Sequence, residues 1–102
     1  MASSQFNIRE TWTTLYTGNT TSGNAINVPN VTSYKEICLM GYVGTNSGGK
    51  RFNVLASTKQ TLSLDYSVFL TPTQAGQLNI LNNNAIVLTA TDAHVTEVYG
   101  VK

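Results

Sequence analysis

Few residues of this 102-residue chain have side chains suited to catalysis. The single histidine, His94, follows Asp92 by two positions, so on a strand both side chains would share one face and could move a proton or hold a metal. A turn is the better interpretation, with Asp92 bonding to nearby backbone and His94 at the surface. The single cysteine, Cys38, lies in an apolar run, where burial raises the pKa of a thiol and leaves a small core side chain.

The carboxylates are scattered over different predicted strands, at Glu10, Glu36, Asp65, Asp92 and Glu97. A glycosidase needs two carboxyl groups on either side of one bond, and no spacing here brings two together. Residues 44–50 (GTNSGGK) contain glycines and a lysine but lack the spacing and the following Ser or Thr of a phosphate-binding loop. The sequence therefore predicts no enzyme, no catalytic residue, no metal site and no cofactor.

Charge is scarce in this chain. Six Lys and Arg against five Asp and Glu give a net charge of +1, and charged residues make up 11% of the chain, against about 25% in an ordinary soluble domain. Eleven Asn, fifteen Thr and eight Ser supply most of the polarity. This composition excludes a basic footprint for nucleic acid, and no apolar run approaches the ~20 residues that would insert into a membrane. Residues 1–5 lack the features of a signal peptide, so we expect synthesis in a reducing cytoplasm.

Short runs of β-branched and aromatic residues, separated by Gly, Asn and Pro, predict strands. The predicted strands cover residues 6–17, 25–28, 36–43, 51–57, 62–70, 78–81, 85–90 and 95–101. A helical turn is expected only at 30–34. Seven or eight strands at this spacing predict an all-β fold, an antiparallel β-sandwich that is jelly-roll-like. We expect one domain over residues 6–102, preceded by a flexible tail over residues 1–5.

Two of these strands have informative patterns. Residues 62–70 alternate, with Ser63, Asp65 and Ser67 on the polar face, as in a half-buried antiparallel strand. Residues 36–43 have no polar face. Their side chains alternate between two apolar sets: Ile37, Leu39 and Val43 on one face, and Cys38, Met40 and Tyr42 on the other. Such a strand is buried on both sides, either by the rest of the fold or by another chain.

Unprotected strand edges favour self-association, and here few charges are present to protect them. Together with the doubly apolar strand, this predicts a homo-oligomer with Cys38, Met40 and Tyr42 at its interface. A monomer whose edges are covered by Thr and Asn is the alternative.

Rigid aromatic rings beside amides and hydroxyls are typical of sugar-binding surfaces. Most aromatic residues here are expected in the core, and Trp12 and Tyr16 are the first candidates for exposure. The turn-rich segments at 19–24, 45–50 and 82–84 are expected to form the contact surface. The predicted ligand-binding residues are Trp12, Tyr16, Asn46 and Asn83.

Residues 12–18 (WTTLYTG) and 26–37 (INVPNVTSYKEI) resemble the C-terminal β domains of bacteriophage tail-fibre and related virion proteins. In those domains a W-x-x-L-Y strand is followed by a Y-x-E-I strand entry. The resemblance covers roughly residues 11–43, and the remainder is similar in composition. It implies a trimeric sandwich domain at a fibre tip or on a capsid surface, located in the virion, whose loops contact a host-surface glycan or protein. The chain has no repetitive shaft, so it corresponds to a fibre-tip domain or to a small stand-alone virion protein.

The leading hypothesis is thus a non-enzymatic virion domain that acts as a homotrimer and gains avidity from several weak sites. The alternative is a monomeric carbohydrate-binding module of a secreted bacterial enzyme, with Trp12 and Tyr16 as its stacking platform. A small glycan-cleaving enzyme is disfavoured by the scattered carboxylates. The mass in solution separates the first two hypotheses.

Overall fold

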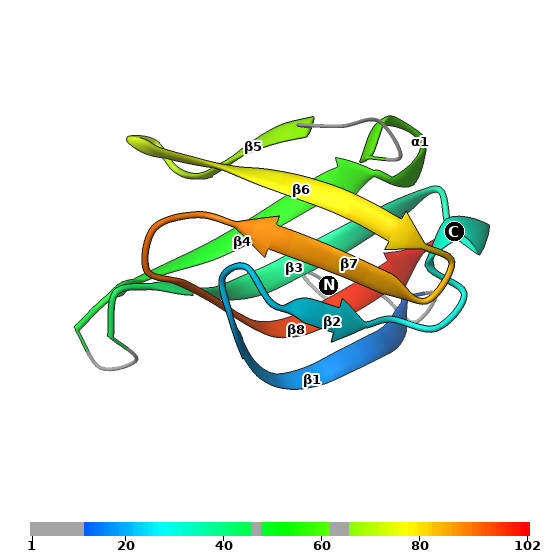
Figure 1. Cartoon of the computed structure of the whole chain (residues 1–102), viewed down its shortest axis with the longest axis horizontal. Helices are drawn as coiled ribbons and strands as arrows, with labels where there is room; N and C mark the ends of the chain where they lie inside the picture. Colours follow the sequence, from blue (N-terminus) through cyan, green and yellow to red (C-terminus); the bar gives the residue numbers. More distant parts are fainter. Residues whose placement is uncertain (1–11, 46–47, 62–65) are drawn as a thin grey trace, which may run out of the picture.

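The computed structural model describes residues 12–45, 48–61 and 66–102. Within these residues two antiparallel sheets pack face to face (Figure 1). The strands are β1 (Thr13–Thr21), β2 (Ala25–Asn27), β3 (Glu36–Val43), β4 (Lys50–Ser57), β5 (Tyr66–Thr71), β6 (Gln74–Asn82), β7 (Ala85–Thr89) and β8 (Ala93–Val101). Sheet A has the order β1-β8-β3-β4, and sheet B has the order β2-β7-β6-β5. The predicted all-β sandwich is confirmed.

Strands from the two ends of the chain pair with one another. β1 pairs with β8 in sheet A, and β2 pairs with β7 in sheet B. Between them, β3–β4, β5–β6 and β6–β7 are sequential antiparallel pairs. The first two strands therefore wrap around the last two, which gives the sandwich its jelly-roll-like character.

The core lies between the sheets and is built from alternate residues of nearly every strand. Its largest fully buried side chains are aliphatic: Ile26, Val28, Val31, Ile37, Leu39, Leu78, Ile86, Leu88, Val95 and Val98. Removal of this apolar surface from water is the main term that stabilises the fold.

Strand β3 is central in sheet A, between β8 and β4. Ile37 and Leu39 point into the core, while Cys38 and Tyr42 lie on the opposite, outer face of the sheet and are also buried. The prediction that this strand is buried on both faces is confirmed for these residues.

Strand β1 extends further than the sequence pattern indicates. A turn is expected to begin at Gly18, but β1 continues to Thr21. Two register shifts against β8, between Thr14 and Tyr16 and between Thr17 and Thr20, absorb the turn-forming residues within the strand. Such bulges let an irregular sequence remain paired. The first part of the predicted strand at 6–17 lies outside the described residues.

The single-turn helix η1 (Val31–Ser33) forms inside the predicted 30–34 segment. A second turn, α1 (Thr58–Thr61), is not predicted. The reason is tertiary. The hydroxyl of the buried Thr58 donates to the carbonyl oxygens of Tyr34 at 2.5 Å and Lys35 at 3.1 Å, which fixes the chain where it leaves β4.

The predicted strand at 78–81 is longer in the structure, because β6 begins at Gln74. Gln74 pairs directly with Thr71, so the turn between β5 and β6 is tighter than the expected 71–76 loop. The predicted tail over residues 1–5 lies outside the described residues. No helix in the described ranges is long and apolar enough to span a bilayer.

Candidate functional site

The outer face of sheet B carries no charge, since no residue of the described strands β2, β5, β6 and β7 is charged. Alternation within each strand turns most of the aliphatic side chains inward, and the exposed positions are mainly small or neutral polar, with Phe69 and Leu81 as large apolar exceptions. Figure 1 shows these strands as one layer in front of sheet A. The result is a neutral surface that spans the whole sheet.

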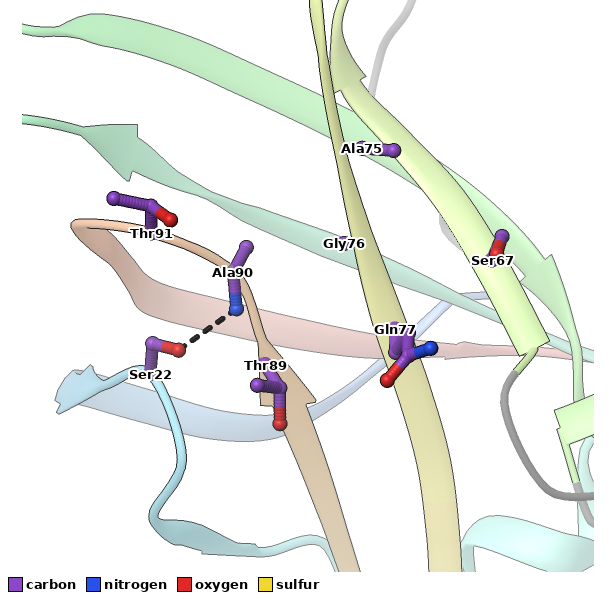
Figure 2. Close-up of a pocket in the computed structure, with 8 residues that line it drawn as sticks. All are labelled: Ser22, Ser67, Ala75, Gly76, Gln77, Thr89, Ala90 and Thr91. Carbon is purple, nitrogen blue, oxygen red and sulfur yellow. Dashed lines mark hydrogen bonds between the residues drawn. The ribbon is translucent and has the colours of Figure 1, made fainter.

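A shallow groove of about 570 Å³ crosses this face. Its lining residues come from three strands and two turns: Ser22, Ser67, Ala75, Gly76, Gln77, Thr89, Ala90 and Thr91 (Figure 2). The floor is low because several of these side chains are small. A Cβ on Gly76 would lie 2.9 Å from the Cβ of Ala90, so the backbone of β6 approaches the end of β7 closely there.

Three polar side chains form a row across the groove. Gln77 of β6 is the register partner of Ser67 in β5 and of Thr89 in β7 (Figure 2). All three are exposed. Within the described part of the chain their side chains form no hydrogen bond. The row therefore offers amide and hydroxyl groups, both donors and acceptors, to a ligand.

An aromatic ring stands beside this row. Phe69 lies on the same face of β5 as Ser67 and is the register partner of Ala75, which lines the groove. Its side chain is 67% exposed, the largest exposed fraction among the large apolar residues described. A flat apolar ring beside free amides and hydroxyls suits a ligand with alternating apolar and hydroxylated faces.

The β7–β8 turn at one side of the groove is held by two hydrogen bonds between a side chain and the backbone. The hydroxyl of Ser22 accepts the amide of Ala90 at 2.8 Å (Figure 2), and Nε2 of Gln74 donates to the carbonyl oxygen of Thr91 at 2.6 Å. These bonds connect the turn before β8 to the β1–β2 turn and to the start of β6. This side of the groove is thus held in place by bonds within the chain.

The lining residues contain no carboxylate, imidazole, thiol or amine. They supply no group with a pKa near neutrality for acid–base chemistry and no activated nucleophile. The described residues contain no group of three or more His, Cys, Asp or Glu side chains able to hold a metal ion. The arrangement can bind a neutral molecule by hydrogen bonds and ring contacts.

The aromatic residues predicted as a platform are used elsewhere. Trp12 is half-buried on the outer face of sheet A, with its ring centroid 6.2 Å from that of Tyr99 and the planes inclined at 41°. Tyr16 is half-buried against the core, and its hydroxyl lies 2.6 Å from Oγ1 of Thr20. Each ring already has a partner within the chain, and neither borders the groove.

The two asparagines predicted to bind a ligand, Asn46 and Asn83, differ in what the structure shows of them. Asn46 lies outside the described residues. Asn83 is exposed, but its Oδ1 accepts hydrogen bonds from the backbone and the hydroxyl of Thr32, and its carbonyl oxygen accepts the amide of Val31 at 2.9 Å. Its Nδ2 contacts Oδ1 of Asn30 at 3.4 Å. The side chain holds the β6–β7 turn against η1, so most of its hydrogen-bonding capacity is used.

The residues predicted for an oligomer interface lie together on the outer face of sheet A. Cys38 is 0% and Tyr42 is 6% exposed, and Met40 is half-buried. Burial raises the pKa of the Cys38 thiol to about 12, and the nearby Glu97 adds to the effect. Two of the three side chains, Cys38 and Tyr42, are therefore already covered within a single chain. Their apolar character is explained without contact with a second chain.

The outer face of sheet A also contains His94. Its ring stacks on Tyr42 at a centroid distance of 4.7 Å, and Tyr42 accepts a hydrogen bond from Nδ2 of Asn19 at 2.8 Å. Asp92 stays in the preceding turn with a positive φ of 55°. Asp92 lies in a turn as predicted, while His94 is half-buried in this stack rather than at an open surface.

The sequence interpretation missed the groove. One signal for it was readable: in the alternating run at 62–70, Phe69 occupies a position of the polar face, and an aromatic ring there must be exposed or covered by a partner. The row of Ser67, Gln77 and Thr89 had no such signal, because it depends on the registers of two separate strand pairs.

In comparisons with known proteins, no family model, no curated protein and no solved structure matches this chain.

Proposed function

We propose that this chain is a non-enzymatic adhesion domain of a bacteriophage virion that binds a neutral glycan of the host surface in the sheet B groove. The observation that carries the binding role is the row of Ser67, Gln77 and Thr89 beside the exposed ring of Phe69. The virion setting, at a fibre tip or on a capsid surface, rests on the resemblance of residues 12–18 and 26–37 to virion appendage domains.

Sugar chemistry suits this surface. A pyranose ring presents hydroxyls around its edge and apolar C–H groups on its faces, so it can hydrogen-bond to the polar row while a face contacts Phe69. Anionic sugars lack a cationic partner in the groove, because none of its lining residues is basic. A site built to bond hydroxyls discriminates against ligands that lack them.

Weak single sites suit a multivalent assembly. One shallow, open groove offers few contacts, and avidity from several linked copies raises the overall affinity without new contacts. An oligomer is therefore part of the proposal, and threefold assembly is the form that the resemblance implies. The alternative is a monomeric carbohydrate-binding module, which the same groove would serve.

A glycan array that contains both neutral and anionic oligosaccharides tests the binding role. Binding is expected for neutral hexose-containing glycans and not for sialylated or sulphated ones. Gln77→Ala and Phe69→Ala should each lower the affinity about tenfold, since one lost contact of ~1.4 kcal/mol has that effect.

Leu81→Ala is the matched control. Leu81 lies on the same strand as Gln77, is 55% exposed and does not line the groove. This variant should bind as the unchanged chain does. Binding of anionic glycans alone, or equal losses in all three variants, would contradict the assignment of the groove.

A further inference from the structure

A second hollow, the end hollow, lies where the β3–β4 and β5–β6 connections come together at one end of the sandwich (Figure 1). Its volume is about 470 Å³, close to the 570 Å³ of the groove. One wall comes from sheet A and the connection that follows β3, and the other comes from the β5–β6 turn of sheet B. Its polar side chains are Thr45, Lys50, Thr71, Thr73 and Gln74.

The end hollow and the groove adjoin at the start of β6. Gln74 lines the end hollow, and the next two residues, Ala75 and Gly76, line the groove. Nε2 of Gln74 also donates to the carbonyl oxygen of Thr91, another residue of the groove. The two hollows therefore meet along one continuous stretch of β6.

The β7–β8 turn is bonded to both walls of the end hollow. On the sheet B side, Thr91 accepts the hydrogen bond from Gln74 at 2.6 Å. On the sheet A side, the carbonyl oxygen of Asp92 accepts the amide of Gly44 at 2.9 Å. One turn thus connects the two walls and also borders the groove.

The polar groups of the end hollow are mainly hydrogen-bond donors. The hydroxyl oxygens of Thr45 and Thr71 accept backbone amides at 2.8 Å and 3.4 Å, so each retains its O–H to donate. Thr73 is exposed, and its hydroxyl forms no hydrogen bond within the described part of the chain. Lys50 is exposed, so its charge is screened by water, and its ammonium group adds further donors. Such a lining suits the oxygen atoms of a hydroxylated ligand.

The end hollow lies too far from the polar row of the groove for one sugar to contact both. Gln77 of the row is three residues from Gln74, and Ser67 of the row is four residues from Thr71. At ~3.3 Å per residue of strand, these separations are about 10–13 Å. A single pyranose ring is shorter than this span, whereas a chain of linked sugars covers it.

The surface between the two contact regions favours such a chain. Ala75 and Gly76 of β6 leave the floor low, and the exposed ring of Phe69 lies beside them as the register partner of Ala75. On β5, Phe69 is two positions after Ser67 and two before Thr71. A ring that contacts the faces of sugars therefore lies between two sets of groups that bond to hydroxyls.

We propose that the end hollow is a second subsite for the same glycan, and that the ligand is a neutral oligosaccharide that runs along the start of β6 from the polar row into the end hollow. This inference rests on the proposed function and defines its ligand class as a chain of linked hexoses, in place of a single terminal sugar. Two shallow subsites that hold one molecule add their contacts without a second binding event.

Chain length tests the inference. The probes are the neutral hexose glycans of the array, as hexasaccharides and as the disaccharides cut from them. In titration calorimetry each hexasaccharide that binds should do so at least about tenfold more tightly than its disaccharide, equivalent to ~1.4 kcal/mol. In NMR spectra both probes should shift the amide signal of Gln77, and only the hexasaccharide should also shift those of Thr73 and Gln74.

A matched pair of threonine variants tests the end hollow itself. Thr73→Ala should lower the affinity for the hexasaccharide about threefold and leave the disaccharide unaffected, because only the longer chain reaches that hydroxyl. Thr14→Ala is the control, since Thr14 is exposed on β1 of sheet A and lines neither hollow. Gln77→Ala should weaken both probes.

The failure of this inference differs from that of the proposed function. Equal affinities for the two chain lengths, or a bound hexasaccharide that leaves the Thr73 and Gln74 signals unshifted, would overturn the second subsite and leave the groove assignment intact. Absence of binding at every chain length would overturn both.

Discussion

The two sheets of this sandwich share one core but have different outer faces. The outer face of sheet A carries large side chains that lie against each other, with Trp12 on Tyr99 and Tyr42 on His94, and it buries Cys38 completely. Sheet B exposes mainly small neutral side chains, together with the ring of Phe69 and the side chain of Leu81. Charges follow the same division, since Glu36, Lys50, Arg51 and Glu97 all lie in sheet A strands.

The two outer faces differ in how much they contribute to the stability of the fold. Side chains that cover one another on sheet A add a second apolar layer and tie its strands together. Side chains on sheet B leave a shallow groove and exposed amide and hydroxyl groups at Ser67, Gln77 and Thr89. A domain with one well-covered sheet can tolerate a second sheet whose outer face is less covered, and this second face is where we propose binding.

The largest expected difference concerns two glycines. A Cβ on Gly41 of sheet A would lie 1.9 Å from the carbonyl oxygen of His94, so Gly41→Ala must separate β3 from β8 and should lower the free energy of unfolding by about 3 kcal/mol or more. A Cβ on Gly76 of sheet B meets Ala90 at 2.9 Å, and Gly76→Ala should cost ~1 kcal/mol. Denaturant titration measures both. If the two substitutions lowered the free energy of unfolding equally, sheet A would not be more tightly packed at its glycine than sheet B.

The reaction rate of the Cys38 thiol measures how well the outer face of sheet A is covered. Its thiol should react with a disulfide reagent at pH 8 at least ~100-fold more slowly in the folded chain than in the denatured chain, because both burial and a raised pKa suppress the thiolate. A serine-to-cysteine variant at Ser67, exposed on sheet B, is the control and should react at the rate of a free thiol.

The raised pKa of the Cys38 thiol predicts how the free energy of unfolding depends on pH. In the unfolded chain it loses its proton near pH 9.0, whereas in the folded chain it keeps the proton up to about 12. Deprotonation then favours the unfolded state, so stability should fall as the pH rises from 9 toward 12. The raised pKa of the Tyr99 hydroxyl, caused by burial and by its bond to Glu97, acts in the same direction. Cys38→Ala should reduce the fall, and an unchanged curve would contradict the cause.

The smallest expected effect lies on sheet B. Phe69→Ser and Leu81→Ser remove side chains that are 67% and 55% exposed, so each should change the free energy of unfolding of the single chain by no more than ~0.5 kcal/mol. Denaturation at low protein concentration measures this. A clearly larger loss for Phe69→Ser than for Leu81→Ser would contradict the exposure of the Phe69 ring.

Much of the fold was predictable because short apolar runs and turn residues are local signals. The run at 36–43 indicated a strand buried on both faces, and 30–34 indicated the helical turn η1. Other features depend on distant partners. β1 continues as a strand beyond Gly18 because its pairing with β8 accommodates two register shifts. α1 forms because the hydroxyl of Thr58 bonds to the carbonyl oxygen of Tyr34, 24 residues earlier.

The binding residues were predicted from residue type, which does not reveal the contacts that each side chain makes within the folded chain. Trp12 and Tyr16 belong to the right classes for a sugar platform, but contacts with Tyr99 and Thr20 already occupy them. Asn83 bonds to Thr32, 51 residues away, which no local pattern reveals. The alternation of the run at 62–70 is a local signal of a different kind, because it puts Phe69 in phase with Ser67, and both are exposed in the structure.

The position of Trp12 has an optical consequence. It is the sole tryptophan of the chain, and its ring lies next to Tyr99 over sheet A, on the other side of the sandwich from the groove. Its emission therefore reports on the environment of one sheet, and a sugar that binds over β6 would leave the spectrum nearly unchanged. A fluorescence titration without quenching therefore does not distinguish an occupied groove from an empty one, and an optical probe for that face has to be introduced there.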